Sequence, residues 1–457
     1  MQRRQFLQLG GIGAAVTVDN LLFGSRTEAD PKPGTVREPA RDLPVVDTAD
    51  VIVCGAGPAG VAAAIAAGCK GAKTILLETH GCLGGIWTSG ALTWLLDYTN
   101  KAGLMKEIVE SMNARGARGL TKKGTGTNAF DTEVMKLFLE ELCEKAGVRI
   151  QLHTRVCAAL KDSANRLSHV ATESKSGREA FAGKVFIDCT GDGDLGAQAG
   201  CGWDMGYRQS GLTQPMSMIA LVAGITTAET NQFVRTEDVP SKDSKANLRA
   251  EIKRGGHLSS YSGPSMFPVR DGLYITMINE EHGYKADNIR HLTAATLHAR
   301  KELHKMIDGL RALGGPWKNI YLVATAEQIG VREGRRIRGL YTVTADDLRE
   351  GRQHKDAICR ATFGIDVHSI HPVEGNKAIE KISFRAKPYD IPLRALIAKD
   401  VQGLMMAGRC ISGDFIAHSS YRVTGNAVAM GEAAGKVAAL AAQTNRLPQA
   451  VNVSEIT

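Results

Sequence analysis

The chain has 457 residues, 43% hydrophobic and 23% charged, a composition that fits an ordinary enzyme with two to three domain-sized units and excludes a fibrous or disordered protein. The net charge of +8 is modest and the basic residues are scattered, which argues against nucleic acid as a partner. Nine cysteines without a C-x-x-C pair argue against a disulfide framework, a zinc site or a dithiol redox centre, and we expect no metal.

Residues 1–45 have the pattern of an export signal followed by a linker. Arg3 and Arg4 precede the apolar run Leu7–Val18, which is too short to span a membrane and matches a signal sequence. Four prolines between positions 31 and 44 then indicate an extended linker. The pattern predicts export to the periplasm by the twin-arginine route, with no transmembrane segment in the mature chain. A disordered basic tail on a cytoplasmic protein is the alternative.

A glycine-rich turn follows the linker. The apolar residues Val51–Val53 lead into Gly55, Gly57 and Gly60 in G-x-G-x-x-G spacing, and the alanine-rich run Val61–Ala67 then predicts a helix. The first glycine permits the tight turn, the second lets backbone approach a pyrophosphate, and the third lets the helix pack closely on the strand. The start of such a helix offers free N–H groups to phosphate.

The next strand supports a nucleotide site over a chance glycine turn. Thr74–Leu77 is apolar and ends at Glu78, 18 positions after Gly60. An acidic side chain at this offset is placed to accept hydrogen bonds from a ribose diol. The combination predicts that the chain binds an adenine dinucleotide.

Paired glycines lie just beyond the strand that ends at Glu78. Gly84 and Gly85, in the loop GCLGGIWTSG, predict backbone lying against a flat or charged ligand, with a flexible loop as the alternative. Here the sequence resembles the FAD-dependent oxidoreductases of the glutathione-reductase-like superfamily, and more narrowly the family with a leucine-glycine-glycine loop. The resemblance implies that this loop, Thr88 included, lies beside the pyrophosphate and isoalloxazine of FAD.

The following segment continues the resemblance. Asp131–Gly147 has helical spacing and a glycine stop, and Val148–Val156 is predicted as a strand. A hairpin with turns at Ser163–Asn165 and Ser174–Gly177 leads to a strand that ends in T-G-D-G-D, residues 190–194. By resemblance Val156 contributes backbone contacts to the adenine, and the T-G-D-G-D turn is a second FAD signature.

Between about Cys201 and Leu322 the resemblance fades, and we expect a cap domain. Pro215–Gly224 is a predicted strand and Asn288–Leu313 a predicted helix. Three histidines of this region, at 257, 282 and 291, are more often surface or core residues than catalytic ones. The region has no second strand–glycine turn–helix pattern, which disfavours a dedicated NAD(P)H domain.

The resemblance returns at Gly330–Asp347, expected as an arginine-rich strand pair over the flavin. Its arginines, at 332, 335, 336 and 338, either hold an acidic ligand or form a solvated strand edge. His368 and His371 lie in a stretch that, by resemblance, returns toward the flavin ring. They act there as a general base or have a structural role.

The closing segment carries a further signature. An apolar strand leads into Gly408 and Arg409, and His418, Arg422, Gly425 and Asn426 precede a helix of small residues, Ala427–Ala442. The spacing H-x-x-x-R-x-x-G-N is similar to that of the fumarate reductase and succinate dehydrogenase flavoproteins. The similarity implies that the arginine binds a substrate carboxylate and that the Gly-Asn pair faces the flavin. Gly413-Asp414 and His418 also resemble a flavin-hydroxylase turn, one residue longer.

These signals together predict an α/β fold: a Rossmann-like FAD-binding domain with a parallel sheet, of the glutathione-reductase type, and an inserted α+β cap. The expected boundaries are 1–45 for signal and linker, 46–203 and 323–445 for the FAD domain, 204–322 for the cap, and 446–457 for a tail. The expected cofactor contacts are Gly55, Gly57, Ala59, Gly60, Glu78, Gly84, Gly85, Thr88, Val156, Thr190, Gly191, Asp192, Gly408, Arg409, Gly425 and Asn426.

The expected function is a FAD-dependent dehydrogenase. It would move a hydride from a small polar, anionic or sugar-like substrate to flavin N5, and pass the electrons to an acceptor other than a domain-bound NAD(P)H. A flavin-dependent monooxygenase and a protein with a structural flavin are the alternatives. The expected catalytic residues are His418, Arg422, His371, His368 and Arg336.

Overall fold

The computed structural model describes residues 34–120, 126–235, 239–371 and 382–456. The chain divides into two units, Met1–Asp42 and Leu43–Thr457. In the first, the described residues 34–42 are exposed and form no helix or strand. Arg3, Arg4 and the apolar run after them lie outside the described residues. Within the described ranges, no helix has the length and apolar character needed to cross a membrane.

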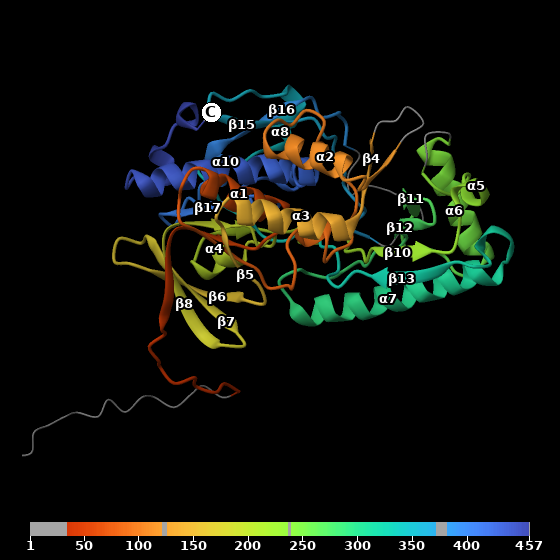
Figure 1. Cartoon of the computed structure of the whole chain (residues 1–457), viewed down its shortest axis with the longest axis horizontal. Helices are drawn as coiled ribbons and strands as arrows, with labels where there is room; N and C mark the ends of the chain where they lie inside the picture. The colour runs from red at the N-terminus through yellow and green to blue at the C-terminus, as the bar shows by residue number, and fades with distance from the viewer. Residues whose placement is uncertain (1–33, 121–125, 236–238, 372–381, 457) are drawn as a thin grey trace, which may run out of the picture. The chain divides into compact units, whose positions relative to one another are not determined.

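A seven-stranded sheet forms the centre of the larger unit (Figure 1). Its order is β5-β2-β1-β8-β7-β6, and β17 also pairs with β8. Strands β5, β2, β1, β8 and β17 run parallel, whereas β8, β7 and β6 form an antiparallel meander. The strands are β1 (Val45–Cys54), β2 (Thr74–Leu77), β5 (Arg149–Gln151), β6 (Arg155–Lys161), β7 (Leu167–Ser174), β8 (Gly177–Asp188) and β17 (Leu404–Met406).

Two helices from opposite ends of the chain pack together beside this sheet. They are α1 (Pro58–Cys69) and α10 (Thr424–Gln443), which lie side by side (Figure 1). The approach is close because α10 has glycine where it meets α1: a Cβ added to Gly435 would lie 2.1 Å from the carbonyl oxygen of Ala63. The C-terminal helix is therefore part of the same hydrophobic core as the N-terminal strand–helix unit.

We expect Gly435→Ala to destabilise the protein. Alanine favours a helix over glycine by about 1 kcal/mol, but its Cβ would overlap the backbone of α1, and overpacking of this kind costs about 1–3 kcal/mol or more. A lower midpoint of thermal unfolding would report the effect. Gly364→Ala is the control, because Gly364 is exposed and no atom lies within 4 Å of its added Cβ. Equal midpoints for both variants would contradict the packing.

A second sheet has its own hydrophobic core. Its antiparallel order is β11-β12-β10-β13, and the long helix α7 packs along β13 (Figure 1). The elements are β10 (Ala220–Ala223), α5 (Thr227–Thr230), α6 (Ser241–Arg254), β11 (Ser265–Arg270), β12 (Leu273–Met277), α7 (Ile289–Ala312) and β13 (Tyr321–Thr325). The boundaries proposed for the cap stay a prediction, since Leu43–Thr457 forms one compact unit.

The remaining elements are short apart from two helices. They are α2 (Leu104–Ala114), β3 (Arg118–Leu120), β4 (Gly126–Phe130), α3 (Thr132–Lys145), α4 (Asp194–Gln198), β9 (Trp203–Asp204), β14 (Arg336–Ile337), α8 (Ala345–Glu350), β15 (Ala357–Ala361), β16 (Tyr389–Pro392) and α9 (Phe415–Tyr421). Antiparallel pairing joins β3 to β4, β9 to β14 and β15 to β16.

Two of the predicted helices lie close to their observed bounds. The expected helix at 131–147 is α3, whose first N–H groups are capped by the Asp131 carboxylate. The expected helix at 288–313 is α7, capped in the same way by Asn288. Both hairpin turns of the β6–β7–β8 meander also lie where expected. The capping residues and the turn residues lie next to the elements that they delimit, so the sequence alone predicts these bounds.

Three predicted strands differ from the structure. Val148–Val156 is two strands, β5 and β6, because His153 has a positive φ of 53° that breaks the extended backbone. In Pro215–Gly224 only β10 is a strand, and Met216 and Ser217 form isolated bridges before it. Gly330–Asp347 is no strand pair: it contains the two-residue β14 and the start of α8.

Candidate functional site

The glycine turn sits between the end of β1 and the start of α1. Gly55 has φ +93°, and a Cβ on it would lie 2.5 Å from the carbonyl oxygen of Cys189. A Cβ on Gly60 would lie 1.8 Å from the carbonyl oxygen of Gly55. Gly57 differs, because no atom lies within 4 Å of its added Cβ. Gly55 and Gly60 therefore allow neighbouring backbone to pack closely, whereas Gly57 borders open space.

The same turn leaves the first N–H groups of α1 available. The helix begins at Pro58, which has no N–H, and no side chain caps its N-terminus. Ala59 follows in the first turn and is buried. A helix start with open space in front and uncapped donors is a ready anion site.

Glu78 is buried directly after β2. Its Oε2 accepts a hydrogen bond from Ala56 N at 2.6 Å, and its Oε1 accepts one from His80 N at 2.9 Å. The carboxylate therefore stabilises the glycine turn, and each oxygen keeps a further lone pair for a donor such as a ribose hydroxyl. The backbone N–H of Thr154 donates to the Glu78 carbonyl at 2.8 Å, which brings the segment leading to Val156 alongside. The Val156 carbonyl accepts from Gln198 Nε2 at 3.2 Å.

The loop with paired glycines lies against this turn. Gly84 and Gly85 both have positive φ, at 104° and 52°. Gly84 N donates to Ala56 O at 2.8 Å, and a Cβ on Gly85 would lie 2.8 Å from Gly57 Cα. The Thr88 hydroxyl donates to Leu83 O at 2.5 Å and so holds the loop. The loop therefore packs on the glycine turn, and its contact with FAD stays a prediction.

The T-G-D-G-D turn follows β8, next to the end of β17. The buried Asp188 carboxylate accepts from Thr190 N, from Thr190 Oγ1 and from Gly196 N. Burial raises the pKa of Asp188 to about 6, and these hydrogen bonds oppose the shift. Thr190 is therefore engaged in holding the turn, with Gly191 at φ +81° beside it.

Arg409 links the T-G-D-G-D turn to the segment that follows Gly330. Its Nη2 lies 2.9 Å from Asp192 Oδ1, and its Nη1 donates to Val331 O at 2.8 Å. Gly408 has φ +90°, and an added Cβ would lie 3.2 Å from Ala59 Cβ in the first turn of α1. The ends of β1, β8 and β17 thus meet at one edge of the sheet, where ligands of open α/β sheets bind.

The start of α10 carries buried polar atoms that have no partner among the described residues. They are Thr424 Oγ1 and both side-chain polar atoms of Asn426, and on the preceding helix α9 both ring nitrogens of His418 are likewise unpartnered. No side chain caps α10, and a Cβ on Gly425 would lie 2.3 Å from Asp97 O. Each unpartnered polar group costs about 1–3 kcal/mol. Such a cluster indicates a bound polar group.

The four arginines after Gly330 have different partners. Arg335 pairs with Asp194 at 2.8 Å, and Arg338 pairs with Asp204 at 3.0 Å near the surface. Arg336 is buried, donates from Nε to Gly413 O at 3.0 Å and pairs with Glu333 at 2.5 Å. The structure therefore gives Arg336 internal partners rather than an open face.

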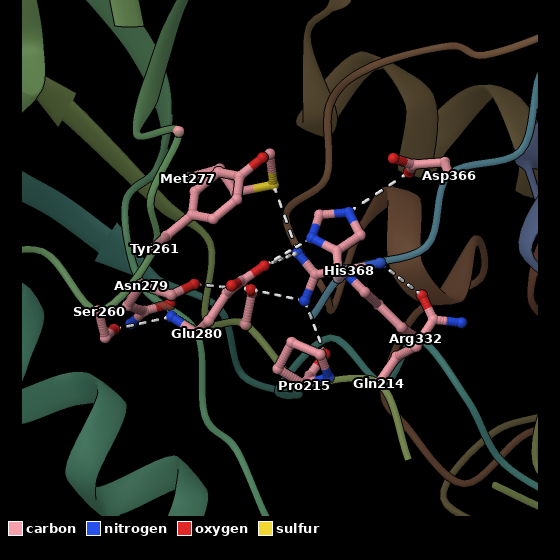
Figure 2. A network of polar contacts seen from close by, with 12 residues as sticks. Gln214, Pro215, Ser260, Tyr261, Met277, Asn279, Glu280, Arg332, Asp366 and His368 are labelled. Carbon is pink, nitrogen blue, oxygen red and sulfur yellow. Dashed lines mark hydrogen bonds and ion pairs between the residues drawn. The ribbon is translucent and has the colours of Figure 1, made fainter. Parts of the chain in front are cut away.

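Arg332 instead points into a polar cluster around His368 (Figure 2). His368 Nδ1 lies 2.5 Å from Glu280 Oε1, and His368 Nε2 lies 3.3 Å from Asp366 Oδ2. Arg332 Nη2 lies 3.7 Å from Glu280 Oε1 and donates from Nη1 to Pro215 O at 2.7 Å. We call Glu280, Arg332, Asp366, His368 and Arg422 the polar cluster.

Arg422 links the polar cluster to the start of α10. Its Nη2 donates to the Asp366 carbonyl at 2.7 Å and lies 3.6 Å from Asp366 Oδ2, and its Nη1 donates to Arg332 O at 3.3 Å. Burial lowers the pKa of Arg422 to about 10, and Asp366 opposes this. Burial would raise the pKa of Asp366, but His368, Arg422 and Arg332 hold it well below its usual range.

Two neighbours complete the environment of Glu280. His282 Nε2 lies 3.9 Å from Glu280 Oε2, and burial lowers the pKa of His282 while Glu280 opposes the shift. The Tyr261 ring lies 5.7 Å from the His368 ring, and burial raises the pKa of Tyr261 to about 12. His371 is exposed, and its polar contacts among the described residues are those of its backbone with Ser369.

The family model described as FAD dependent oxidoreductase matches residues 50–457. The chain belongs to this FAD-dependent oxidoreductase family. Its Rossmann-like fold is that of a FAD-binding enzyme, and its cofactor is FAD. No curated protein matches the sequence significantly.

Several solved structures resemble the oxidoreductase at low identity. A geranylgeranyl bacteriochlorophyll reductase-like protein from Thermoplasma acidophilum is 14% identical, with 87% of this chain and 80% of that chain covered and a TM-score of 0.43. The flavin-dependent brominase Bmp2 is 12% identical, with 87% and 80% covered and a TM-score of 0.45. The p-nitrophenol 4-monooxygenase PnpA from Pseudomonas putida is 10% identical, with 88% and 82% covered and a TM-score of 0.47.

The described residues fit FAD on three counts. Gly57 borders open space at an uncapped helix start, the Gly84–Gly85 loop lies against it, and Thr424 and Asn426 at the start of α10 have buried polar atoms with no partner among the described residues. Bound FAD supplies a two-electron acceptor. The oxidoreductase would hold the FAD phosphates at the start of α1 and present the Asn426 side chain to the polar part of the ring, whereas the Gly425 N–H donates to Leu96 O.

The buried ring of His418 predicts a pH-dependent stability. Burial, with the charges of Arg336, Arg422 and Arg409, holds the pKa of His418 well below its ordinary value. A histidine of the unfolded chain binds a proton near pH 6.5, whereas folded His418 does not, so stability falls below that pH by up to about 1.4 kcal/mol per pH unit. His418→Gln should lose less thermal stability than the wild type between pH 7.5 and pH 5. Parallel losses would contradict a neutral buried ring.

Proposed function

We propose that the oxidoreductase is a dehydrogenase that oxidises a small polar, anionic substrate at a C–H bond next to a hydroxyl or amine. The substrate gives a hydride to FAD and a proton to His368. The observation that carries the proposal is the sharing of Asp366 by His368 and Arg422, which places a base and a buried cation next to the start of α10. A structural flavin site would need neither group.

Glu280 orients the base in this proposal. Its Oε1 accepts from His368 Nδ1, which leaves Nε2 as the nitrogen that can exchange a proton with substrate. Nε2 faces Asp366, whose side chain is 49% exposed, and in this proposal the substrate takes the place of Asp366 at Nε2. The backbone N–H of His368 also donates to Gln214 Oε1 at 3.0 Å, which fixes the loop. With Nδ1 and the backbone held in this way, Nε2 would exchange the proton once substrate replaces Asp366.

Arg422 and Arg332 favour an anionic substrate. Both guanidinium groups are largely buried, with 8% and 13% of their side-chain surface exposed. Their carboxylate partners, Asp366 and Glu280, lie 3.6 and 3.7 Å away, beyond a good hydrogen bond. A substrate carboxylate that displaces Asp366 would therefore gain a charge-assisted contact with Arg422. A sugar acid or a hydroxy acid has this chemistry.

The hydroxylase-like turn has a structural role at Asp414. Asp414 Oδ1 caps α9 by accepting from Ala417 N at 2.7 Å, and its Oδ2 accepts from Ala345 N at 2.7 Å. These bonds leave the monooxygenase alternative open, and the test below separates the two.

Anaerobic reduction of the bound flavin tests the proposal. Hydroxy acids, sugar acids and neutral polyols are mixed with the FAD-loaded protein, and loss of the flavin absorption is followed, with NADH and NADPH as separate reductants. We expect bleaching by an anionic substrate and none of comparable rate by the nicotinamides. Reduction by NAD(P)H alone would favour a monooxygenase and contradict the proposal.

A further inference from the structure

A second group of charged side chains lies next to the polar cluster but is not part of it. Glu281 follows Glu280 after β12, and His298 and Glu302 are one helical turn apart on α7. One ligand atom of each of these three residues lies within 4.8 Å of the others. His298 Nδ1 is 2.8 Å from Glu281 Oε2. We call these three residues the α7 cluster.

Two carboxylates of the α7 cluster are buried close to each other. Glu281 is 3% exposed and Glu302 is 5% exposed. Within the described ranges, each forms an ion pair only with a histidine, Glu281 with His298 and Glu302 with His257, and neither with a lysine or arginine. Two buried carboxylates at this separation repel each other strongly unless a cation or a proton lies between them.

One oxygen of the α7 cluster has no hydrogen-bond partner in the described part of the chain. Glu281 Oε1 is buried and accepts no hydrogen bond from the described residues. Glu302, in contrast, accepts from Ser260 N at 3.0 Å and from Ser260 Oγ at 2.8 Å, and lies 3.4 Å from His257 Nε2. The Glu281 carboxylate thus has unused acceptor capacity inside the cluster, where a metal ion would use it.

We propose that Glu281, His298 and Glu302 bind one divalent transition-metal ion, with zinc as the best match. One imidazole and two carboxylates are zinc ligands, and tetrahedral coordination at about 2.1 Å places ligand atoms about 3.4 Å apart, within reach of the observed spacing. The His298 side chain is 64% exposed, which gives the ion a path from solvent. His257 orients the Glu302 carboxylate from outside, as supporting residues of metal sites do.

Zinc at this site would also help to position His368, the base of the proposed dehydrogenase. This statement rests on the proposed function. Ser260 Oγ donates to Glu302 Oε2 and accepts from Glu280 N at 2.8 Å. Glu280 in turn accepts from His368 Nδ1. Zinc bound at Glu302 would therefore fix, through Ser260, the backbone from which the Glu280 carboxylate reaches His368.

Zinc binding to the FAD-loaded full-length protein tests the inference. After treatment with a chelator, zinc is titrated by calorimetry, and metal content is measured after dialysis. We expect one zinc per chain and a higher thermal midpoint with zinc. His298→Ala and Glu281→Gln should each weaken zinc binding by about 10²-fold or more. The loss of a residue that only supports a metal ligand already lowers metal affinity by about 10- to 100-fold. His304→Ala, an exposed histidine on the same helix, should bind zinc like the wild type.

The variants separate this site from adventitious binding and from the proposed function. His298 is exposed, so its loss should leave the fold and the FAD content unchanged. A variant that is misfolded would be recognised by its altered FAD content. Wild-type zinc affinity in His298→Ala and Glu281→Gln, or no stoichiometric zinc in the wild type, would overturn the inference. Flavin reduction is measured separately, so a dehydrogenase without zinc and a zinc protein without the predicted activity give different results.

Discussion

Gly57→Glu should abolish FAD binding while the FAD-free chain keeps its fold. The Cβ of the added side chain would have no atom of the described residues within 4 Å, and Gly57 has an ordinary φ of −66°. Its carboxylate would instead lie at the uncapped start of α1, where the FAD phosphates need to bind. Gly57→Ala should have a graded effect, about 10–100-fold in affinity, the scale of 1–3 kcal/mol of steric overlap.

Gly60→Ala provides the contrast within the same motif. Its Cβ would lie 1.8 Å from the Gly55 carbonyl oxygen, so it should destabilise the chain with or without FAD. FAD content of the purified variants and the thermal midpoint of the FAD-free chains are the two measurements. If Gly57→Glu retains FAD, or if the FAD-free Gly57 and Gly60 variants are equally destabilised, the assignment of open space to the ligand is wrong.

His368→Gln should slow substrate-driven flavin reduction by about 10²- to 10⁴-fold, the usual contribution of a positioned general base. Arg422→Lys should slow it by about 10²-fold, because an ammonium group cannot reproduce the planar fork that contacts both Asp366 and Arg332. Both variants should keep FAD. Stopped-flow measurement of flavin bleaching gives the rates, and the pH dependence of the rate should be lost in His368→Gln.

His371→Gln is the matched control for the base. His371 lies three positions away in the same stretch, but it is exposed and contacts its neighbours through its backbone. Its replacement should leave the reduction rate within about twofold of the wild type, as for surface substitutions that touch nothing. A slow His371→Gln together with a normal His368→Gln would exchange the roles of the two histidines and refute the site as described.

The FAD-binding half of the protein could be predicted because its signals are local. The strand–glycine turn–helix unit, Glu78 and the paired glycines all lie within Asp50–Gly90, and their spacing fixes the geometry of one turn. In the structure Gly85 lies on Gly57. The closing motif is local in the same way, since Gly425 and Asn426 are the second and third residues of α10.

The polar cluster could be predicted only in part because its members come from distant segments. His368, Arg422 and Arg332 were recognised as candidates one by one, but Glu280 and Asp366 were missed. Nothing in the sequence near Glu280 shows that this residue contacts His368, 88 positions later. Such pairings depend on how the second sheet packs against the closing segment.

Arg336 has its partner close by in the sequence. Glu333 precedes it by three residues and the two buried side chains pair, although neither residue belongs to a helix, so the spacing alone does not predict the pair. His418 is another residue that the sequence predicts as catalytic. Its ring is fully buried, so we expect it to contact the bound cofactor rather than to exchange protons with solvent.

A crystal structure of the FAD-loaded protein with an anionic substrate analogue would test the central claim most directly. The account predicts phosphates at the N-terminus of α1 beside Gly57, the polar edge of the isoalloxazine ring at Asn426, and the analogue's carboxylate at Arg422 with Asp366 displaced from His368. A flavin ring remote from Asn426 and Arg422, with the polar cluster unchanged and no analogue bound to it, would contradict the account.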